Sequence, residues 1–363
     1  MFKNLFIIGN GFDLNLNYNT RFKDFINFCI RFDKFIANIS EFKSSLYIRL
    51  ENTKLNSLND FDKDLGVKRD YIYDLPKLVS NGKIVYNGNE YESKSIYLDF
   101  RERINNSYLI KYYKRIINDD IFNTWADVEM NLTDLCKAHL GNANKEGYYY
   151  YFTYIDIRCV CKKISTAEFV NLLFEDINKF KELFSIYINS FVQIAQSQCS
   201  MDQFHKYKSS FENESTCILN FNYTNFSRLI SNCAHFSVHG DVENKDIVLG
   251  INPLDKDLGN EFNILKKKCL VDLKQLSGFD NQKGRIIVLG HSLGIVDEYI
   301  LKQIFDKFYG EIILTYYDSV NKDEKLKNRL SRITSNKNIK SYNIISEWAG
   351  LIKYVGGNIP WIK

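Results

Sequence analysis

Four short segments of this sequence carry polar side chains directly after an apolar run, and three of them also contain glycine. They are Gly9-Asn10-Gly11-Phe12-Asp13, Asn222-Tyr223-Thr224, His239-Gly240 and Gly290-His291-Ser292. In an open α/β sheet, ligands bind beyond the carboxyl ends of the strands. Glycine allows a close approach of the backbone, while amide, hydroxyl and imidazole groups can hold and activate a ligand. The four segments therefore predict a nucleotide-type pocket.

The first segment has two interpretations. Gly9 and Gly11 would let the chain turn beside a phosphate, which the amides of a following helix could bind. Position 14 is Leu, so the full G-x-G-x-x-G fingerprint is absent and an ordinary tight turn explains the glycines as well. A carboxylate repels pyrophosphate, so we expect Asp13 to accept hydrogen bonds from a ribose hydroxyl or to cap the helix.

The second and third segments carry the groups best suited to catalysis. Asn222 places a side-chain amide at the end of an apolar run, although asparagine also satisfies backbone groups in ordinary turns. His239 follows another such run, and an imidazole titrates near neutral pH. Its position among the other strand ends favours a general base over a buried structural histidine.

The fourth segment continues to Gly294 and matches G-x-S-x-G, the nucleophile elbow of serine hydrolases, with Ser292 as the nucleophile. In that fold the catalytic histidine follows the serine in the chain. His291 is the last of the five histidines, so the sequence argues against a serine hydrolase.

The elements that must position these segments are strands and helices of an α/β fold. Apolar runs predict strands at residues 2–8, 217–221, 236–238, 247–249, 285–289, 311–317 and 341–345. Helical spacing of apolar residues predicts a helix over 22–36, and Ser165 with Glu168 forms a capping box before a long amphipathic helix that extends to Ala195. Residues 83–86, followed by Asn87-Gly88, predict a hairpin.

These elements predict a Rossmann-like parallel sheet with a large, mainly helical insertion. We expect residues 1–40 and 211–363 to form the nucleotide-binding core, because the first strand must join the strands near the end of the chain. Residues 41–210 would then form the inserted cap, which includes the small hairpin.

Composition narrows the class of protein further. The 363 residues carry a net charge of +4, too small to indicate nucleic acid or an anionic membrane as the partner. The sequence shows neither a secretory signal nor an apolar run long enough to span a membrane, so we expect a cytoplasmic protein. The eight cysteines lack paired C-x-x-C spacing, and although Cys159 and Cys161 would share one face of a strand, we expect no metal site.

The motifs together resemble the AbiH family of bacterial phage abortive-infection proteins. The resemblance rests on Ile7-Ile-Gly-Asn-Gly-Phe-Asp-Leu14, Trp125 with Glu129, Asn220-Phe-Asn-Tyr-Thr224, His239-Gly240, Gly250-Ile-Asn252 and Gly290-His-Ser-Leu-Gly294 with Asp297. It implies an abortive-infection effector with a phage-derived trigger.

A looser similarity is to the sirtuin-like NAD-binding fold. Asn222 and His239 stand where that fold has its catalytic pair, which implies that Asn222 holds a water or the nicotinamide ribose and His239 acts as base. The four-cysteine zinc module of sirtuin deacylases is missing, so the resemblance implies an NAD glycohydrolase, with NAD as the substrate, rather than a deacylase. Across these motifs we expect nucleotide contacts from Gly9, Asn10, Gly11, Phe12, Asp13, Tyr223, Thr224, Gly240, Gly290, His291, Ser292 and Asp297, although Asp13 departs from the small polar residue that ends the sirtuin glycine loop.

Two other functions stay open. An effector acting on RNA or DNA could use the run Lys266-Lys267-Lys268, although such a run is usually a solvated face and the net charge gives little support. A sensor could instead bind a nucleotide without chemistry and signal through the insertion. Trp125 and Glu129, one helical turn apart, could reach the pocket or simply pack locally. Homo-oligomerisation is compatible with each function.

Overall fold

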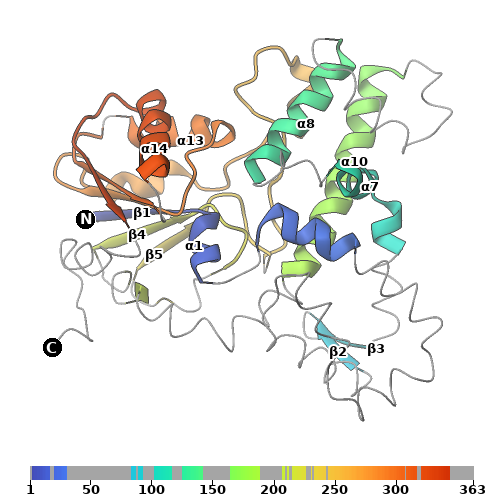
Figure 1. Ribbon diagram of the computed structural model, residues 1–363, viewed down its shortest axis with the longest axis horizontal. Coiled ribbons are helices and arrows are strands. Elements are labelled where there is room, and N and C mark those ends of the chain that lie inside the picture. The colour runs from blue at the N-terminus through green and yellow to red at the C-terminus, as the bar shows by residue number, and fades with distance from the viewer. Residues whose placement is uncertain are drawn as a thin grey trace. The chain divides into compact units, whose positions relative to one another are not determined.

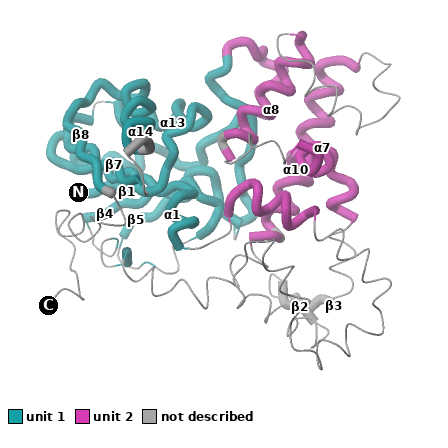
Figure 2. The backbone as a smooth tube through the Cα atoms, viewed as in Figure 1, with its two compact units in different colours: residues 1–18, 199–255, 266–363 teal, residues 19–198, 256–265 magenta. Residues whose placement is uncertain are grey.

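The computed structural model describes residues 2–16, 20–30, 83–86, 89–92, 102–116, 125–141, 164–188, 207–208, 211, 215–225, 230, 233–242, 244–306, 308–316 and 320–343. The chain divides into two compact units (Figure 2). Unit 1 comprises Met1–Tyr18, Cys199–Asp255 and Lys266–Lys363, and unit 2 comprises Asn19–Gln198 and Lys256–Leu265. Unit 2 thus includes residues 19–40 and 256–265, which the predicted division assigned to the core.

A six-stranded, entirely parallel sheet forms the centre of unit 1 (Figure 1). Its strands are β1 (Asn4–Ile8), β4 (Thr216–Asn220), β5 (Ala234–Ser237), β6 (Arg285–Leu289), β7 (Glu311–Tyr316) and β8 (Ile339–Asn343). Their spatial order is β5-β4-β1-β6-β7-β8. Along the chain this order is the 3-2-1-4-5-6 order of dinucleotide-binding sheets. The predicted α/β Rossmann-like fold is confirmed.

The strands form because their apolar residues are buried on both faces of the sheet. Leu5 and Ile7 share one face with Ile286 and Val288, and helices α13 (Glu298–Phe305) and α14 (Val320–Ile333) pack on that face. Phe6 faces the opposite way, where its ring meets the Phe211 ring edge-on with the centroids 5.0 Å apart.

β1 lies at the point where the strand order reverses, because β4 and β6 flank it on its two sides. Ile8, the last residue of β1, is level with Asn220 of β4 and with Leu289 of β6. The segments that follow these three strands therefore begin at the same height. This reversal is where ligands bind in open α/β sheets.

Most predicted strands are confirmed, with ends shifted by a few residues. Residues 247–249 are an exception, because they form no strand although they are largely buried. The amide of Val248 bonds to the carbonyl of His239, but no ladder extends from that bond. The glycine segment is also not a plain loop, since helix α1 (Asn10–Asn15) begins inside it.

Unit 2 contains the helices α7 (Tyr108–Ile116), α8 (Trp125–His139) and α10 (Thr166–Tyr187), the short η5 (Asn260–Leu265), and helical residues 22–30 and 102–106. The capping box is confirmed at its first half, because Ser165 Oγ accepts a hydrogen bond from the amide of Glu168 at 3.2 Å. β2 (Lys83–Tyr86) and β3 (Asn89–Glu92) pair antiparallel as predicted. Residues 31–36 and 189–195 of the predicted helices, the turn Asn87-Gly88, and Cys159 with Cys161 lie outside the described residues.

The core of unit 2 is aromatic. Phe25, Phe180 and Phe184 are buried, and the ring of Trp125 lies 4.3 Å from that of Phe184 between centroids. Within the described part of the chain, no helix combines the length and apolar character needed to cross a membrane.

Candidate functional site

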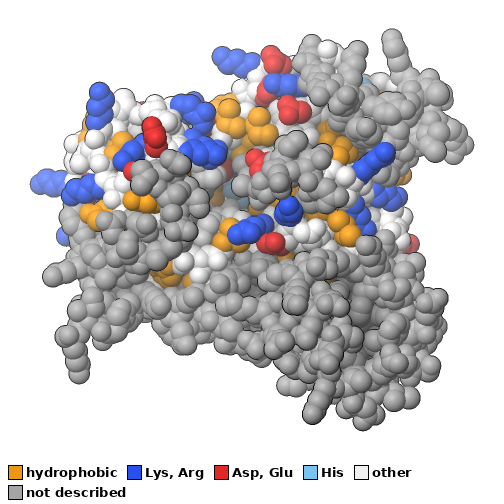
Figure 3. Space-filling view, viewed as in Figure 1, with side chains coloured by type: hydrophobic (Ala, Val, Ile, Leu, Met, Phe, Trp, Pro, Cys, Tyr) orange, Lys and Arg blue, Asp and Glu red, His pale blue; other side chains and the backbone are white. Residues whose placement is uncertain are grey.

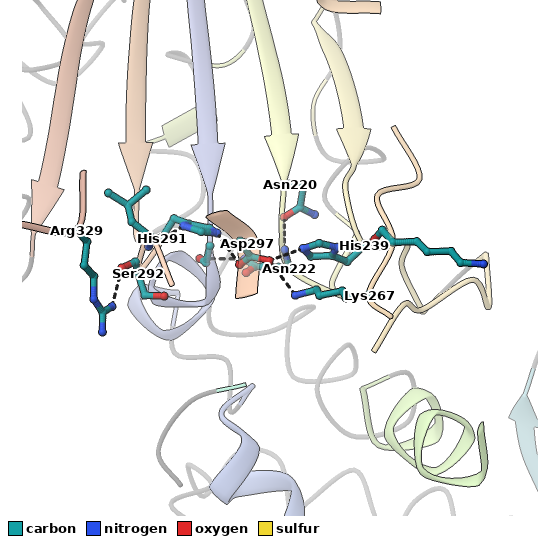
Figure 4. Close-up of polar contacts among 11 residues, drawn as sticks. Asn220, Asn222, His239, Lys267, His291, Ser292, Asp297 and Arg329 are labelled. Atoms are coloured by element: carbon teal, nitrogen blue, oxygen red, sulfur yellow. Dashed lines mark hydrogen bonds and ion pairs between the residues drawn. The ribbon is translucent and has the colours of Figure 1, made fainter. Parts of the chain in front are cut away.

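The four predicted segments lie at the carboxyl edge of the parallel sheet of unit 1 (Figure 4). Three of them are in direct contact. Asn222, after β4, donates from Nδ2 to the carbonyl of Gly9, after β1, at 3.1 Å. Gly11 donates its amide to the carbonyl of Gly290, after β6, at 2.9 Å. The structure therefore brings together residues more than 270 positions apart in the chain.

The glycines after β1 and β6 allow the two segments to approach closely, because they carry no side chain. A β-carbon on Gly9 would lie 2.5 Å from Cα of His291, and one on Gly11 would lie 2.8 Å from the carbonyl oxygen of Gly290. Gly290 itself has φ +68°, and a β-carbon there would collide with the amide nitrogen of Phe12. Backbone from the neighbouring segment fills the space that each missing side chain leaves.

Asp13 is buried beside β4 and accepts two hydrogen bonds from that segment. Its Oδ1 accepts from Nδ2 of Asn222 at 2.7 Å, and its Oδ2 accepts from the hydroxyl of Thr224 at 2.8 Å. Neither bond caps α1, whose N-cap residue is Gly9. The carboxylate thus ties the start of α1 to the segment after β4.

Asn222 has an acceptor that its surroundings do not satisfy. Two acceptors, Gly9 O and Asp13 Oδ1, face its nitrogen, so the orientation of the amide is fixed by its contacts. The other end, Oδ1, is buried and has no hydrogen-bond partner among the described residues. A buried acceptor without a partner costs roughly 1–3 kcal/mol, so a donor such as water or a ligand hydroxyl would be stabilised there.

Asn220 shapes the turn that presents Asn222. Its Oδ1 accepts from the amide of Asn222 at 3.0 Å, and its Nδ2 donates to the carbonyl of Thr224 at 2.7 Å. Both contacts bond a side chain to nearby backbone, as asparagine does in turns. The turn interpretation therefore fits Asn220, while Asn222 keeps an unused acceptor.

A buried cluster of charged and titratable groups surrounds Asp297 (Figure 4). Oδ1 of Asp297 lies 2.9 Å from Nε2 of His239 and 2.9 Å from Nζ of Lys267. Oδ2 of Asp297 lies 3.4 Å from Nε2 of His291. One carboxylate therefore has neighbours from three separate segments, of which two, those of His239 and His291, were predicted.

The contacts define the protonation states in this cluster. Burial alone would raise the pKa of Asp297, but Lys267 and His239 hold it well below the ordinary value. Burial and the Lys267 ammonium lower the pKa of His239 to about 4, although Asp297 acts in the opposite direction. At neutral pH the carboxylate is therefore ionised and the His239 ring is neutral, with its proton on Nε2 facing Asp297.

Both ring nitrogens of His239 have protein neighbours, since Nδ1 lies 3.3 Å from the carbonyl oxygen of Lys268. His291 is oriented in a similar way, because its Nδ1 accepts from the amide of Leu293 at 2.9 Å. The ring of Phe221 meets both imidazoles edge-on, with centroids 5.3 Å from His239 and 4.4 Å from His291. The two histidines are thus held by polar and aromatic contacts together.

Ser292 does not form the nucleophile of a hydrolase triad in this arrangement. Its side chain is exposed, whereas the two histidines of the site are buried. Its carbonyl accepts from Nη1 of Arg329 at 2.7 Å. This geometry agrees with the sequence argument against a serine hydrolase.

The remaining predicted contact residues differ in their surroundings. Phe12 is fully buried and its ring packs edge-on against Tyr207, 5.0 Å away between centroids. Tyr223 is buried and donates its hydroxyl to the carbonyl of Val248 at 3.3 Å. Gly240 has φ +70°, and a β-carbon there would collide with the carbonyl of Asp246. Asn10 is partly exposed.

Trp125 and Glu129 lie in unit 2. The indole nitrogen of Trp125 donates to the carbonyl of Thr20 at 2.9 Å, and Glu129 is 1% exposed. Trp125 therefore packs within unit 2, against Thr20 and Phe184. Among the described residues, no group of three or more His, Cys, Asp or Glu side chains is placed to hold a metal ion.

Lys267 is the site residue that the sequence did not indicate. It belongs to a run of three lysines, yet it is 5% exposed while Lys268 is exposed. The signal was alternation in the sequence, because the apolar residues Leu265 and Cys269 stand two positions before and two positions after Lys267. This burial removes Lys267 from the surface that a nucleic acid would contact.

Comparison with known proteins agrees with the motifs of the site. The family model described as "Bacteriophage abortive infection AbiH" matches residues 5–318, which include all four segments and Asp297. No curated protein and no solved structure matches the chain. Because the match covers far more than half of its length, the chain belongs to the AbiH family of bacteriophage abortive-infection proteins.

Proposed function

We propose that this abortive-infection protein binds NAD at the carboxyl edge of its sheet and hydrolyses the bond between nicotinamide and ribose. The observation that carries the proposal is the buried, unpartnered Oδ1 of Asn222, held at the reversal of strand order. A ribose hydroxyl or a water molecule would donate to this oxygen. Either partner would stand at the reacting end of the nucleotide.

The reaction consumes one water and releases nicotinamide, ADP-ribose and a proton. The bond to nicotinamide breaks with both electrons leaving on the ring nitrogen, and the ribose carbon gains positive charge that the water then neutralises. Asn222 would hold the water or the ribose, and His239 would accept the proton. His239 is a neutral imidazole at neutral pH, as proton acceptance requires.

Proton transfer to His239 requires one of its contacts to open, because Asp297 faces Nε2 and the Lys268 carbonyl faces Nδ1. The same contacts favour a second candidate, a sensor that binds the nucleotide without turning it over. Both candidates share the binding site, so they differ only in the release of nicotinamide.

The basic side chains give less support to an effector of nucleic acids. On the face shown in Figure 3, Lys and Arg are interspersed with acidic and apolar side chains rather than gathered into one surface. The net charge of +4 is also small. RNA or DNA cleavage with NAD left intact would nevertheless favour that alternative.

The test is nicotinamide release from NAD by the purified protein, with Asn222→Ala and His239→Ala as variants. We expect each variant to lower turnover by at least about 100-fold, the range for loss of a general base or of its water. Asn225→Ala is the matched control, because Asn225 lies in the same segment but bonds to Asp241 at 3.1 Å. Unchanged turnover in folded variants would remove both residues from the mechanism.

If the wild-type protein releases no nicotinamide, nucleotide binding is measured in the same samples by calorimetry. Binding that is lost in Asn222→Ala would support the sensor. The absence of both release and binding would overturn the nucleotide site and favour a nucleic-acid substrate.

A further inference from the structure

We propose that Lys267 is a positioning residue of this site: its buried ammonium, paired with Asp297, keeps His239 neutral. Its importance for catalysis rests on the proposed function, but the electrostatic role itself does not.

Lys267 is held in the site by its backbone as well as by its charge. Its amide donates to the carbonyl of Ile251 at 3.0 Å, and the amide of Leu270 donates to the carbonyl of Val238 at 2.9 Å. These bonds attach the lysine segment to Val238, directly before His239, and to Ile251, further along the same part of the chain. The side chain of Lys267 is 4% exposed, so its ammonium has little access to water.

A buried ammonium needs a negative partner, and Asp297 supplies it. The two groups lie 2.9 Å apart, and the carboxylate side chain is itself only 11% exposed. Removing one partner from such a pair leaves an uncompensated charge, which costs several kcal/mol and is usually neutralised by a shift in protonation. The charge state of the whole cluster therefore depends on both partners.

The ion pair determines whether the His239 ring is a neutral imidazole or an imidazolium. While Lys267 compensates Asp297, these two charges cancel and the His239 ring stays neutral. Without the ammonium, the carboxylate would gain its compensation from an imidazolium, and His239 is the nearer histidine at 2.9 Å, against 3.4 Å for His291. The other polar and ring contacts of His239 within the described residues are with the Lys268 carbonyl and the uncharged ring of Phe221, and neither can replace the ammonium.

Lys267 would therefore act on catalysis through His239 and not by touching the substrate. An imidazolium cannot accept a proton, so loss of Lys267 would remove the base at any pH below its new midpoint. Lys266 and Lys268 lie beside Lys267 in the same segment, but their side chains are not buried. Replacing either of them removes one positive charge without removing a buried ammonium, so both serve as controls.

The first experiment is an NMR titration of the protein labelled with ¹³C in its histidine rings, with His239→Gln to assign the signal. We expect His239 to titrate near pH 4 in the wild type. In Lys267→Met the midpoint should rise by roughly 1–3 pH units, the usual effect of a nearby charge. Lys266→Met and Lys268→Met should leave it in place. An unmoved midpoint in folded Lys267→Met would overturn the proposal.

A second pair of variants decides the matter if Lys267→Met does not fold. Asp297→Asn retains the ammonium without its partner, and the double variant Lys267→Met/Asp297→Asn leaves no lone buried charge. We expect His239 to titrate at a higher pH in the double variant than in Asp297→Asn, because only the single variant keeps the repelling ammonium. Equal midpoints would show that Lys267 does not act on His239.

The titration needs no substrate, so its result is separate from that of the proposed function. A moved midpoint without nicotinamide release by the wild type would leave Lys267 in its role and remove the hydrolase. If release does occur, the acid limb of its pH profile should follow the NMR midpoint and rise by the same amount in Lys267→Met. A fall in turnover without a shifted profile would indicate a merely structural role and overturn the proposal.

Discussion

Gly9 and His291 lie so close together that the backbones after β1 and β6 are in van der Waals contact. A β-carbon on Gly9 would stand 2.5 Å from Cα of His291, a distance that no folded protein tolerates without movement. The junction of the two strands thus requires that position 9 carry no side chain, as it does at Gly11 and Gly290.

We expect Gly9→Ala to lower the free energy of unfolding by about 3 kcal/mol, the upper end of the usual cost of overpacking. Gly278→Ala is the control, because a β-carbon there would lie 3.6 Å from the Phe2 ring, an ordinary contact. Denaturant unfolding of both variants measures the difference. Equal losses would show that the two segments can separate freely.

Replacing Thr224 should show how much Asp13 depends on the segment after β4. Thr224→Val removes the hydroxyl that donates to Asp13 Oδ2 at 2.8 Å and leaves a buried carboxylate oxygen with one donor fewer. We expect a loss of roughly 1–3 kcal/mol in the free energy of unfolding. Thr224→Ser keeps the hydroxyl and should cost clearly less. The prediction fails if valine and serine are equally stable.

Stability should fall in mild acid because of His235 as well as His239. Burial lowers the pKa of His235 to about 4, although Asp241 acts in the opposite direction, and its Nε2 has no partner among the described residues. The unfolded chain binds this proton first, near pH 6.5, so the contribution is complete above pH 6.5 and is lost as pH falls towards 4.

The contribution of His235 is at most about 3.5 kcal/mol, since its pKa falls from 6.5 to about 4 and one pKa unit corresponds to about 1.4 kcal/mol. His235→Leu should therefore reduce the loss of stability between pH 7 and pH 4.5, measured by urea unfolding at both values. An unchanged pH dependence in this variant would show that His235 is protonated equally in both states.

Asp176 should contribute more than an ordinary helix cap to unit 2. Its carboxylate accepts from the amides of Tyr108 and Leu109 at 2.9 Å and 2.6 Å, at the start of α7, and the residue is 1% exposed. We expect Asp176→Ala to cost about 3 kcal/mol, because the two charge-assisted bonds are buried. Ser165→Ala, at the exposed cap of α10, should cost about 1 kcal/mol. Thermal unfolding of both variants gives the comparison, and a smaller effect at Asp176 would contradict it.

The strands could be predicted because each depends on a local apolar run. Residues 285–289 were predicted with their observed ends, the run at 217–221 was displaced by one residue, and the run at 311–317 extended one residue too far. Residues 247–249 have the same apolar character, but their contact with the adjacent segment is a single hydrogen bond, from the amide of Val248 to the carbonyl of His239. An apolar run indicates burial, whereas a strand also needs an adjacent segment that pairs with it over several residues.

The sequence predicts which segments of the site lie together, because this follows from the parallel arrangement of the strands. Their carboxyl ends share one edge, so the segments with Asn222 and His239 had to lie near Gly9. The partners of each group could not be read from the sequence. Lys267 meets Asp297 across 30 residues, and Gly9 meets His291 across the whole inserted unit. Such contacts depend on the packing of segments that sequence spacing does not relate.

The central position of β1 has a consequence for the order in which the protein is made. β1 leaves the ribosome first, but its partners β4 and β6 begin only at Thr216 and Arg285. Pairing across such separations is slow, and the first strand must wait unpaired while the helical segments between can already fold. The carboxylate that holds both histidines arrives later still. A nascent chain therefore lacks the assembled cluster until translation has passed Asp297, by which point four of the six strands of the sheet have been synthesised.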